Sequence, residues 1–147
     1  MRIPAACSSG GDDGGDDEAN ERKAKVFFSR GRDVADTGNY EYAIEMYLQG
    51  LLITPENVAA HRELREIALK RKADGGKDLG MLEKMKLDAT LANATDDKQA
   101  MLLAEKLLAH DPGKLEWMVA AANRASRAGF PKAAEWFAEL ARKAAGD

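Results

Sequence analysis

The chain is poor in the residues that carry most covalent, metal and acid–base chemistry. Its 147 residues include one cysteine, Cys7, and two histidines, His61 and His110. One cysteine cannot form an internal disulfide bond, and neither histidine has a cysteine beside it to complete a metal-ligand motif. No nucleophile motif or paired-carboxylate motif is evident either. We therefore expect no metal, no cofactor and no catalytic residues, and hence a protein that is not an enzyme.

Long apolar runs and a strong excess of basic charge are also missing. The sequence holds no stretch of about 18 apolar residues, so hydropathy predicts no transmembrane segment. It has 22 basic and 25 acidic residues, and residues 1–21 hold one of the basic and six of the acidic ones, which leaves 21 and 19 in the rest. This near-neutral remainder argues against a strongly basic nucleic-acid-binding protein. We expect a cytoplasmic protein.

Residues 1–21 are rich in glycine and aspartate and contain almost nothing apolar after Cys7. Such a segment cannot repay the entropy of ordering, so the sequence predicts a disordered tail over 1–21 and a folded domain over 22–147. The letters PAACS around Cys7 are similar to the lipidation box of a bacterial lipoprotein. Only six residues precede the cysteine, fewer than the apolar part of a signal peptide needs. A lipid anchor at Cys7 would therefore require a start site further upstream.

The clearest pattern covers residues 24–57. Apolar residues recur there at helical spacing in two blocks. Between the blocks, Gly38 can take the positive φ that ends a helix, and Asn39 can cap the next one. Pro55 then ends the second helix. The stretch predicts one helical hairpin with a period of about 34 residues.

Residues at fixed offsets in this hairpin resemble the tetratricopeptide repeat, whose pattern asks for an aromatic residue, Leu-Gly, a second aromatic residue, alanine, a third aromatic residue and proline. The five positions that agree are Phe27, Gly31, Ala43, Tyr47 and Pro55. Arg30 and Val34 replace the leucine and tyrosine of the pattern. Small residues at Gly31 and Ala43, and Gly50 further along, would let the two helices approach closely.

Weaker copies of the hairpin follow at 81–114 and 115–147. In the first copy, Ala100 and Pro112 keep the twelve-residue spacing of the matching pair in the first hairpin. In the second copy, Gly129 repeats the turn glycine, and a proline opens the last helix. The copy at 81–114 lacks the aromatic residues of the pattern, so its match to the repeat is less specific.

The interval 58–80 is too short for the period and is predicted as an irregular helix and loop. If every loop is tight, the helices alternate direction and number seven. If the repeat phase holds instead, one unit is degenerate. In either case the sequence predicts an all-α fold, and the resemblance implies a right-handed superhelical array of antiparallel hairpins.

The resemblance also implies a function. Proteins of this family mostly bind peptides or partner proteins in a concave groove lined by the first helix of each hairpin. We therefore expect a non-catalytic scaffold for a protein or peptide partner. The candidate groove residues are Phe28, Arg32, Arg62, Arg65, Glu66, Leu69, Met85, Asn123 and Arg127.

A basic strip over residues 62–77 supports an alternative function. The cations of this strip are Arg62, Arg65, Lys70, Arg71, Lys72 and Lys77. Such a set could serve an RNA-associated or acidic-ligand-binding module, and it could equally be a solvated helix face. The two functions differ in salt dependence, because phosphate binding weakens steeply as the salt concentration rises.

The last helix has a wide apolar side. Trp136 extends this side beyond the stripe that one packing contact needs. The end of a helical array normally carries a polar outer face. The pattern therefore predicts that this helix docks onto something, associates with another copy or continues into further chain.

Overall fold

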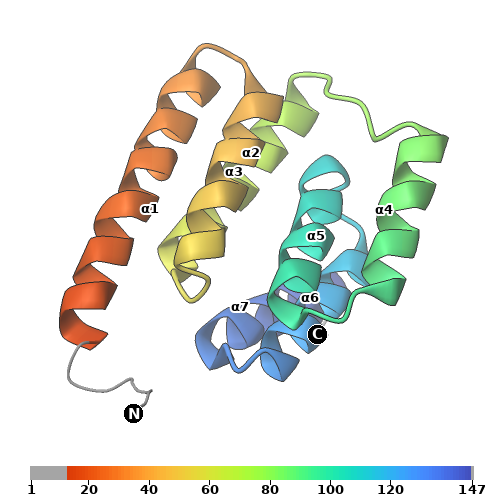
Figure 1. Cartoon of the computed structure of the whole chain (residues 1–147). Coiled ribbons are helices and arrows are strands. Elements are labelled where there is room, and N and C mark those ends of the chain that lie inside the picture. Colours follow the sequence, from red (N-terminus) through yellow and green to blue (C-terminus); the bar gives the residue numbers. More distant parts are fainter. Residues whose placement is uncertain (1–12, 147) are drawn as a thin grey trace.

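The computed structural model describes residues 13–146, and no strand occurs in that range. The described chain forms seven α-helices, as the tight-loop interpretation predicts (Figure 1). Their bounds are α1 Asp13–Asp36, α2 Tyr40–Ile53, α3 Val58–Ala73, α4 Met81–Asn93, α5 Asp97–His110, α6 Leu115–Arg127 and α7 Pro131–Ala144.

The first helix begins earlier than the sequence predicts. Residues 13–21 belong to the predicted disordered tail but form the first turns of α1, so that part of the prediction is wrong. Ala24 and Phe28 are buried and hold the middle of the helix, and extending a packed helix is far cheaper than nucleating one. The acidic residues at its start also suit the positive end of the helix dipole. The rest of the predicted tail, residues 1–12 with Cys7, lies outside the described residues.

The hairpin of α1 and α2 has the predicted construction. Gly38 in the turn has a φ of +86°. A side chain added at Gly31 would place its Cβ 2.7 Å from Cδ1 of Tyr47, and one added at Gly50 would lie 2.3 Å from Cε1 of Phe28. Since real Cβ atoms essentially never approach so closely, both glycines are needed for the contact between the two helices. The predicted close approach is confirmed.

Helices α5, α6 and α7 pack as consecutive neighbours at the other end of the chain. Gly129 in the last turn has a φ of +84°, and Pro131 opens α7 at its first turn, as predicted. α5 is the most enclosed helix, since α2, α3, α4 and α6 all contact it. Its central position explains why nine of its fourteen residues are buried.

The last helix packs against α3, four helices earlier in the chain. The ring of Trp136 stacks on that of His61 with centroids 5.8 Å apart, and Phe137 meets the same imidazole edge-on at 5.1 Å. The Glu56 carboxylate accepts hydrogen bonds from the backbone N–H groups of Lys132 and Ala133, which satisfies donors at the start of α7. The predicted docking surface on α7 is therefore occupied, at least in part, by α3 of the same chain.

Helix α4 is the least packed of the seven. Leu91 is its only buried residue, while Met81, Leu82 and Met85 are 79%, 74% and 60% exposed. In Figure 1 it stands at the edge of the molecule, joined to α3 by a long loop and packed beside α5. The predicted hairpin 81–114 thus consists of an enclosed α5 and a peripheral α4.

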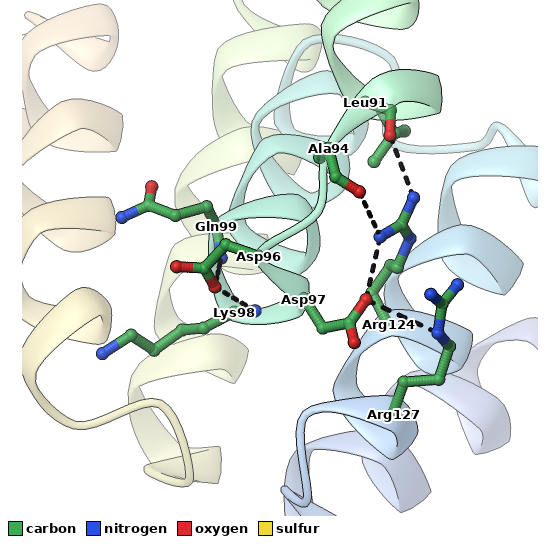
Figure 2. A network of polar contacts seen from close by, with 8 residues as sticks. All are labelled: Leu91, Ala94, Asp96, Asp97, Lys98, Gln99, Arg124 and Arg127. Carbon is green, nitrogen blue, oxygen red and sulfur yellow. Dashed lines mark hydrogen bonds and ion pairs between the residues drawn. The ribbon is translucent and has the colours of Figure 1, made fainter.

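One arginine of α6 holds the end of α4 in place (Figure 2). Nη1 of Arg124 donates to the carbonyl of Ala94 at 3.0 Å and to Oδ1 of Asp97 at 2.8 Å, and Nη2 donates to the carbonyl of Leu91 at 3.1 Å. Carbonyls at a helix C-terminus have no partner within the helix and attract positive charge. The guanidinium therefore joins α4, the start of α5 and α6.

Replacing Arg124 with alanine should release α4. Hydrogen bonds to a charged group each contribute about 1.5–3 kcal/mol, so amide hydrogen exchange in α4 should become roughly 10 to 100 times faster. Arg127→Ala is the matched control, because Arg127 is mostly exposed and its Nε lies 3.5 Å from Asp97. Equal exchange rates in the two variants would show that Arg124 does not anchor α4.

Candidate binding groove between α1 and α3

A groove of about 780 Å³ lies between α1, the end of α2 with the loop 54–57, and the start of α3. Its apolar lining residues are buried or half-buried, except for Ala59, and its charged lining residues are mostly exposed. The apolar lining consists of Ala24, Phe28, Ile53, Pro55, Ala59 and Ala60. The charged lining consists of Asp17, Glu18, Glu21, Arg22, Lys25, Arg32, Glu56 and Glu63. The groove therefore has an apolar floor and a charged rim, as ligand sites commonly do.

The wall on α1 is one face of the helix. Asp17, Glu21, Ala24 and Phe28 follow each other at steps of four, three and four residues, which places them on the same side. Phe28 is only 5% exposed, because its ring packs on Tyr47 with centroids 5.2 Å apart. The floor of the groove is therefore ordered before any ligand arrives.

A polar network fixes one end of the groove. The hydroxyl of Tyr47 donates to Oε1 of Glu63 at 2.6 Å, and Nη1 of Arg32 lies 3.1 Å from the same oxygen. Burial and the neighbouring Glu63 raise the pKa of Tyr47 well above its ordinary value, so its hydroxyl remains a neutral donor. These three residues come from α2, α3 and α1, and they hold the three helices together.

The loop wall rests on a buried pair. His61 is fully buried, with Nδ1 2.8 Å and 3.0 Å from the carboxylate oxygens of Glu105 and Nε2 2.7 Å from the carbonyl of Pro55. Both ring nitrogens face acceptors, and only a doubly protonated imidazole can donate to both. Burial lowers the pKa of His61, but the charge and hydrogen bond of Glu105, with Pro55 and Glu56, raise it above its ordinary value. A buried imidazolium therefore holds the Pro55 carbonyl behind the groove wall.

Two of the nine predicted groove residues, Phe28 and Arg32, line this groove. Arg62, Glu66 and Leu69 are exposed elsewhere on α3, and Arg65 is half-buried. Met85 lies on the exposed side of α4, while Asn123 and Arg127 are exposed on α6. These seven residues come from three helices and do not line the groove between α1 and α3.

Half of the predicted basic strip has partners inside the protein. Arg71 is buried, with Nε 2.8 Å from Glu41 and Nη2 donating to the carbonyl of Lys77. Nη1 of Arg65 donates to the carbonyl of Pro112 at 2.9 Å, and Lys72 lies 3.3 Å from Asp78. Counting charges along a helix face does not reveal which of them are buried. The strip thus presents fewer free cations than its sequence suggests.

The sequence did not predict two parts of the groove. One is the acidic wall, formed by Asp17, Glu18 and Glu21 of α1, and the other is the wall formed by the loop 54–57. Asp17, Glu18 and Glu21 fell within the predicted disordered tail, so they were not considered as groove residues. The available signal was the helical spacing that runs back from Phe28 through Ala24 to Glu21. Nothing in the sequence indicated that the loop would form a wall, because that depends on how α3 packs.

Among the described side chains, residues 16–146, no group of three or more His, Cys, Asp or Glu could hold a metal ion. None of the helices in residues 13–146 is both long and apolar enough to cross a bilayer. Comparisons with protein-family models, curated proteins and solved structures gave no match.

Proposed function

We propose that the protein is a non-catalytic interaction module that binds a peptide segment of a partner protein in the groove between α1 and α3. One observation carries this proposal: a groove between two helices is rimmed by charges and has an apolar lining, in which Ile53 and Pro55 are half-buried and Ala59 is exposed beside a buried, ordered layer that includes Phe28. Binding to a preformed apolar surface releases water at little cost in protein ordering. A segment that inserts an apolar side chain over the floor would gain this stabilisation.

The groove residues suit binding rather than chemistry. The lining contains no imidazole, thiol or lysine–carboxylate pair at hydrogen-bond distance. Of its carboxylates, Glu56 accepts from the start of α7 and Glu63 accepts from Tyr47. Such carboxylates position backbone and side chains of the protein, and they are poorly placed to take a proton from a ligand.

The proposal extends to the architecture. We propose a tetratricopeptide-like right-handed array in which α1 and α3 are the first helices of successive units and line the concave side. The glycine-mediated contact of α1 with α2 supports this arrangement, as do the turn glycine and proline of α6 and α7. In this arrangement α4 is an additional helix at the edge of the array. The packing of α7 on α3 brings the last helix of the array back to its middle.

A groove-blocking variant tests the proposal. Ala59 is exposed and lines the groove, so Ala59→Trp should fill it without disturbing the core. Ala138 on α7 is also exposed and does not line this groove, which makes Ala138→Trp the matched control. Peptides should be selected from a displayed random library and their affinities measured by fluorescence anisotropy. We expect Ala59→Trp to weaken binding more than tenfold and Ala138→Trp to leave it unchanged.

Two results would contradict the proposal. One is a library that yields no specific peptide. The other is a set of selected peptides that bind Ala59→Trp as tightly as the unmodified protein, since their site would then lie elsewhere.

A further inference from the structure

The charges around the groove fall into two groups. Glu56, Glu63 and Arg32 are engaged in the contacts that hold the helices together. The side chains of the other five are exposed and make no hydrogen bond or ion pair with another side chain in 16–146. These five are Asp17, Glu18, Glu21, Arg22 and Lys25. Their charges are available to a ligand.

The free acidic residues face the groove more directly than the free basic ones. Arg22 and Lys25 also line a shallow hollow on the outer side of α1, together with Val26 and Ser29. Asp17, Glu18 and Glu21 line the groove and not that hollow. The positive end of the α1 dipole, about half an elementary charge, offsets less than one of these carboxylates. The free charge on the groove side is therefore mainly negative.

The distance between the acidic residues and the apolar residues along α1 sets the distance between the matching groups of a ligand. Glu21 precedes Phe28 by seven residues, and Asp17 precedes Ala24 by seven. On a helix, seven residues correspond to about 10 Å. A ligand that fits both features needs an apolar side chain and a cation about 10 Å apart. Residues i and i+7 of a helical ligand meet this requirement, and so do residues i and i+3 of an extended one.

We infer that the groove takes a basic amphipathic segment of a partner protein. An apolar side chain of the segment lies in the groove against Ile53, Pro55 and Ala59, and a lysine or arginine about 10 Å away reaches Asp17 and Glu21. This inference rests on the proposed function and adds the chemistry of the partner. The exposed carboxylates, screened within about 10 Å by salt, supply selectivity and faster association.

The selected library gives the first test. When selection is done at 150 mM NaCl, the enriched peptides should carry a net positive charge and an apolar residue at one of the two spacings. If acidic or uncharged peptides are enriched instead and do not bind Ala59→Trp, the inference of a basic partner is wrong but the proposed function is supported. A library that yields no binder, or binders indifferent to Ala59→Trp, would remove both.

A charge reversal gives the second test. Asp17→Lys/Glu21→Lys should weaken the best selected peptide at least tenfold, with Asp17→Asn/Glu21→Gln intermediate. The matched control is Glu83→Lys/Asp88→Lys, which reverses two exposed charges on α4 and should leave affinity unchanged. Circular dichroism checks that each variant is helical. Unchanged affinity in the first variant, or tighter binding of a glutamate-substituted peptide or a single-stranded oligonucleotide, would overturn the inference.

Discussion

Replacing Glu105 with leucine should lower the free energy of unfolding by about 3–5 kcal/mol at pH 7. Glu105 and His61 are both buried. Among the ion pairs formed by side chains in 16–146, this is the only one in which both partners are buried. Without the carboxylate, His61 must either keep an unpaired buried charge or give up its proton. Urea denaturation followed by circular dichroism measures the loss.

The pH dependence of stability should change sign in the same variant. In the unmodified protein the pKa of His61 is raised above its unfolded value of about 6.5, so the folded state binds the extra proton. The resulting stability is fully present below about pH 6.5 and is lost as the pH rises through the folded pKa. In Glu105→Leu, burial still lowers the pKa of the imidazole, and only the smaller effects of the Pro55 carbonyl and Glu56 oppose it. The pKa should therefore fall below its ordinary value, so stability is lost as the pH falls. Denaturation curves between pH 5.5 and 8.5 should therefore slope in opposite directions.

An exposed pair provides the control. Glu45 lies 3.1 Å from Lys106, and both side chains are partly exposed, so Glu45→Gln should cost less than about 1 kcal/mol. His61→Phe/Glu105→Leu should recover much of the loss, because it removes both charges together. A loss in Glu105→Leu no larger than that in Glu45→Gln, or an unchanged slope with pH, would show that His61 is not held as an imidazolium.

The features that the sequence predicted well depend on neighbouring residues. The positive φ at Gly38 and Gly129 and the start of α7 at Pro131 follow from backbone preferences that act over a few residues. The side-chain oxygen of Asn39 caps α2 by accepting from the N–H of Tyr42 for the same reason. The turns and helix starts could therefore be predicted without knowledge of the tertiary packing, whereas the choice between seven alternating helices and a degenerate repeat came from the structure.

The features that the sequence did not predict depend on residues far apart in the chain. His61 and Glu105 are 44 residues apart, and their pairing requires α3 to lie against α5. Likewise, Arg124 reaches the carbonyl of Leu91 across 33 residues. Helical periodicity predicts on which face of its own helix a residue lies, but it does not predict which other helix packs against that face. The repeat pattern alone would also have left α7 away from α3.

The groove shows how a composition rule can hide a site. The glycine and aspartate content of residues 1–21 indicates that this segment cannot form a hydrophobic core of its own. Composition does not indicate whether such a segment extends a helix that is already packed further along the chain. Ala24 and Phe28 anchor α1, and residues 13–21 continue it as one wall of the groove. The candidate partner surface therefore lies partly in the segment that composition excluded.

Replacing Phe28 with alanine should cost about 3–5 kcal/mol, the usual loss for a large aromatic side chain removed from a core. Phe28 is buried against Tyr47 and fills the space over Gly50. In the unmodified protein, Gly50→Ala should lower stability by up to about 2 kcal/mol. Its gain of about 1 kcal/mol in helix propensity is exceeded by the collision of the new Cβ with the Phe28 ring.

The two changes should not add. Once Phe28→Ala has removed the ring, the Cβ of Gly50→Ala no longer collides with its three nearest neighbours, which are all atoms of that ring, and the substitution should stabilise the protein by up to about 1 kcal/mol. The effect of Gly50→Ala therefore changes sign with the residue at position 28. Gln49→Ala, at the exposed neighbouring position of α2, should change stability by less than about 0.5 kcal/mol in either background. If Gly50→Ala stabilises both backgrounds equally, the Phe28 ring does not lie on Gly50, and the floor of the groove would have to be built differently.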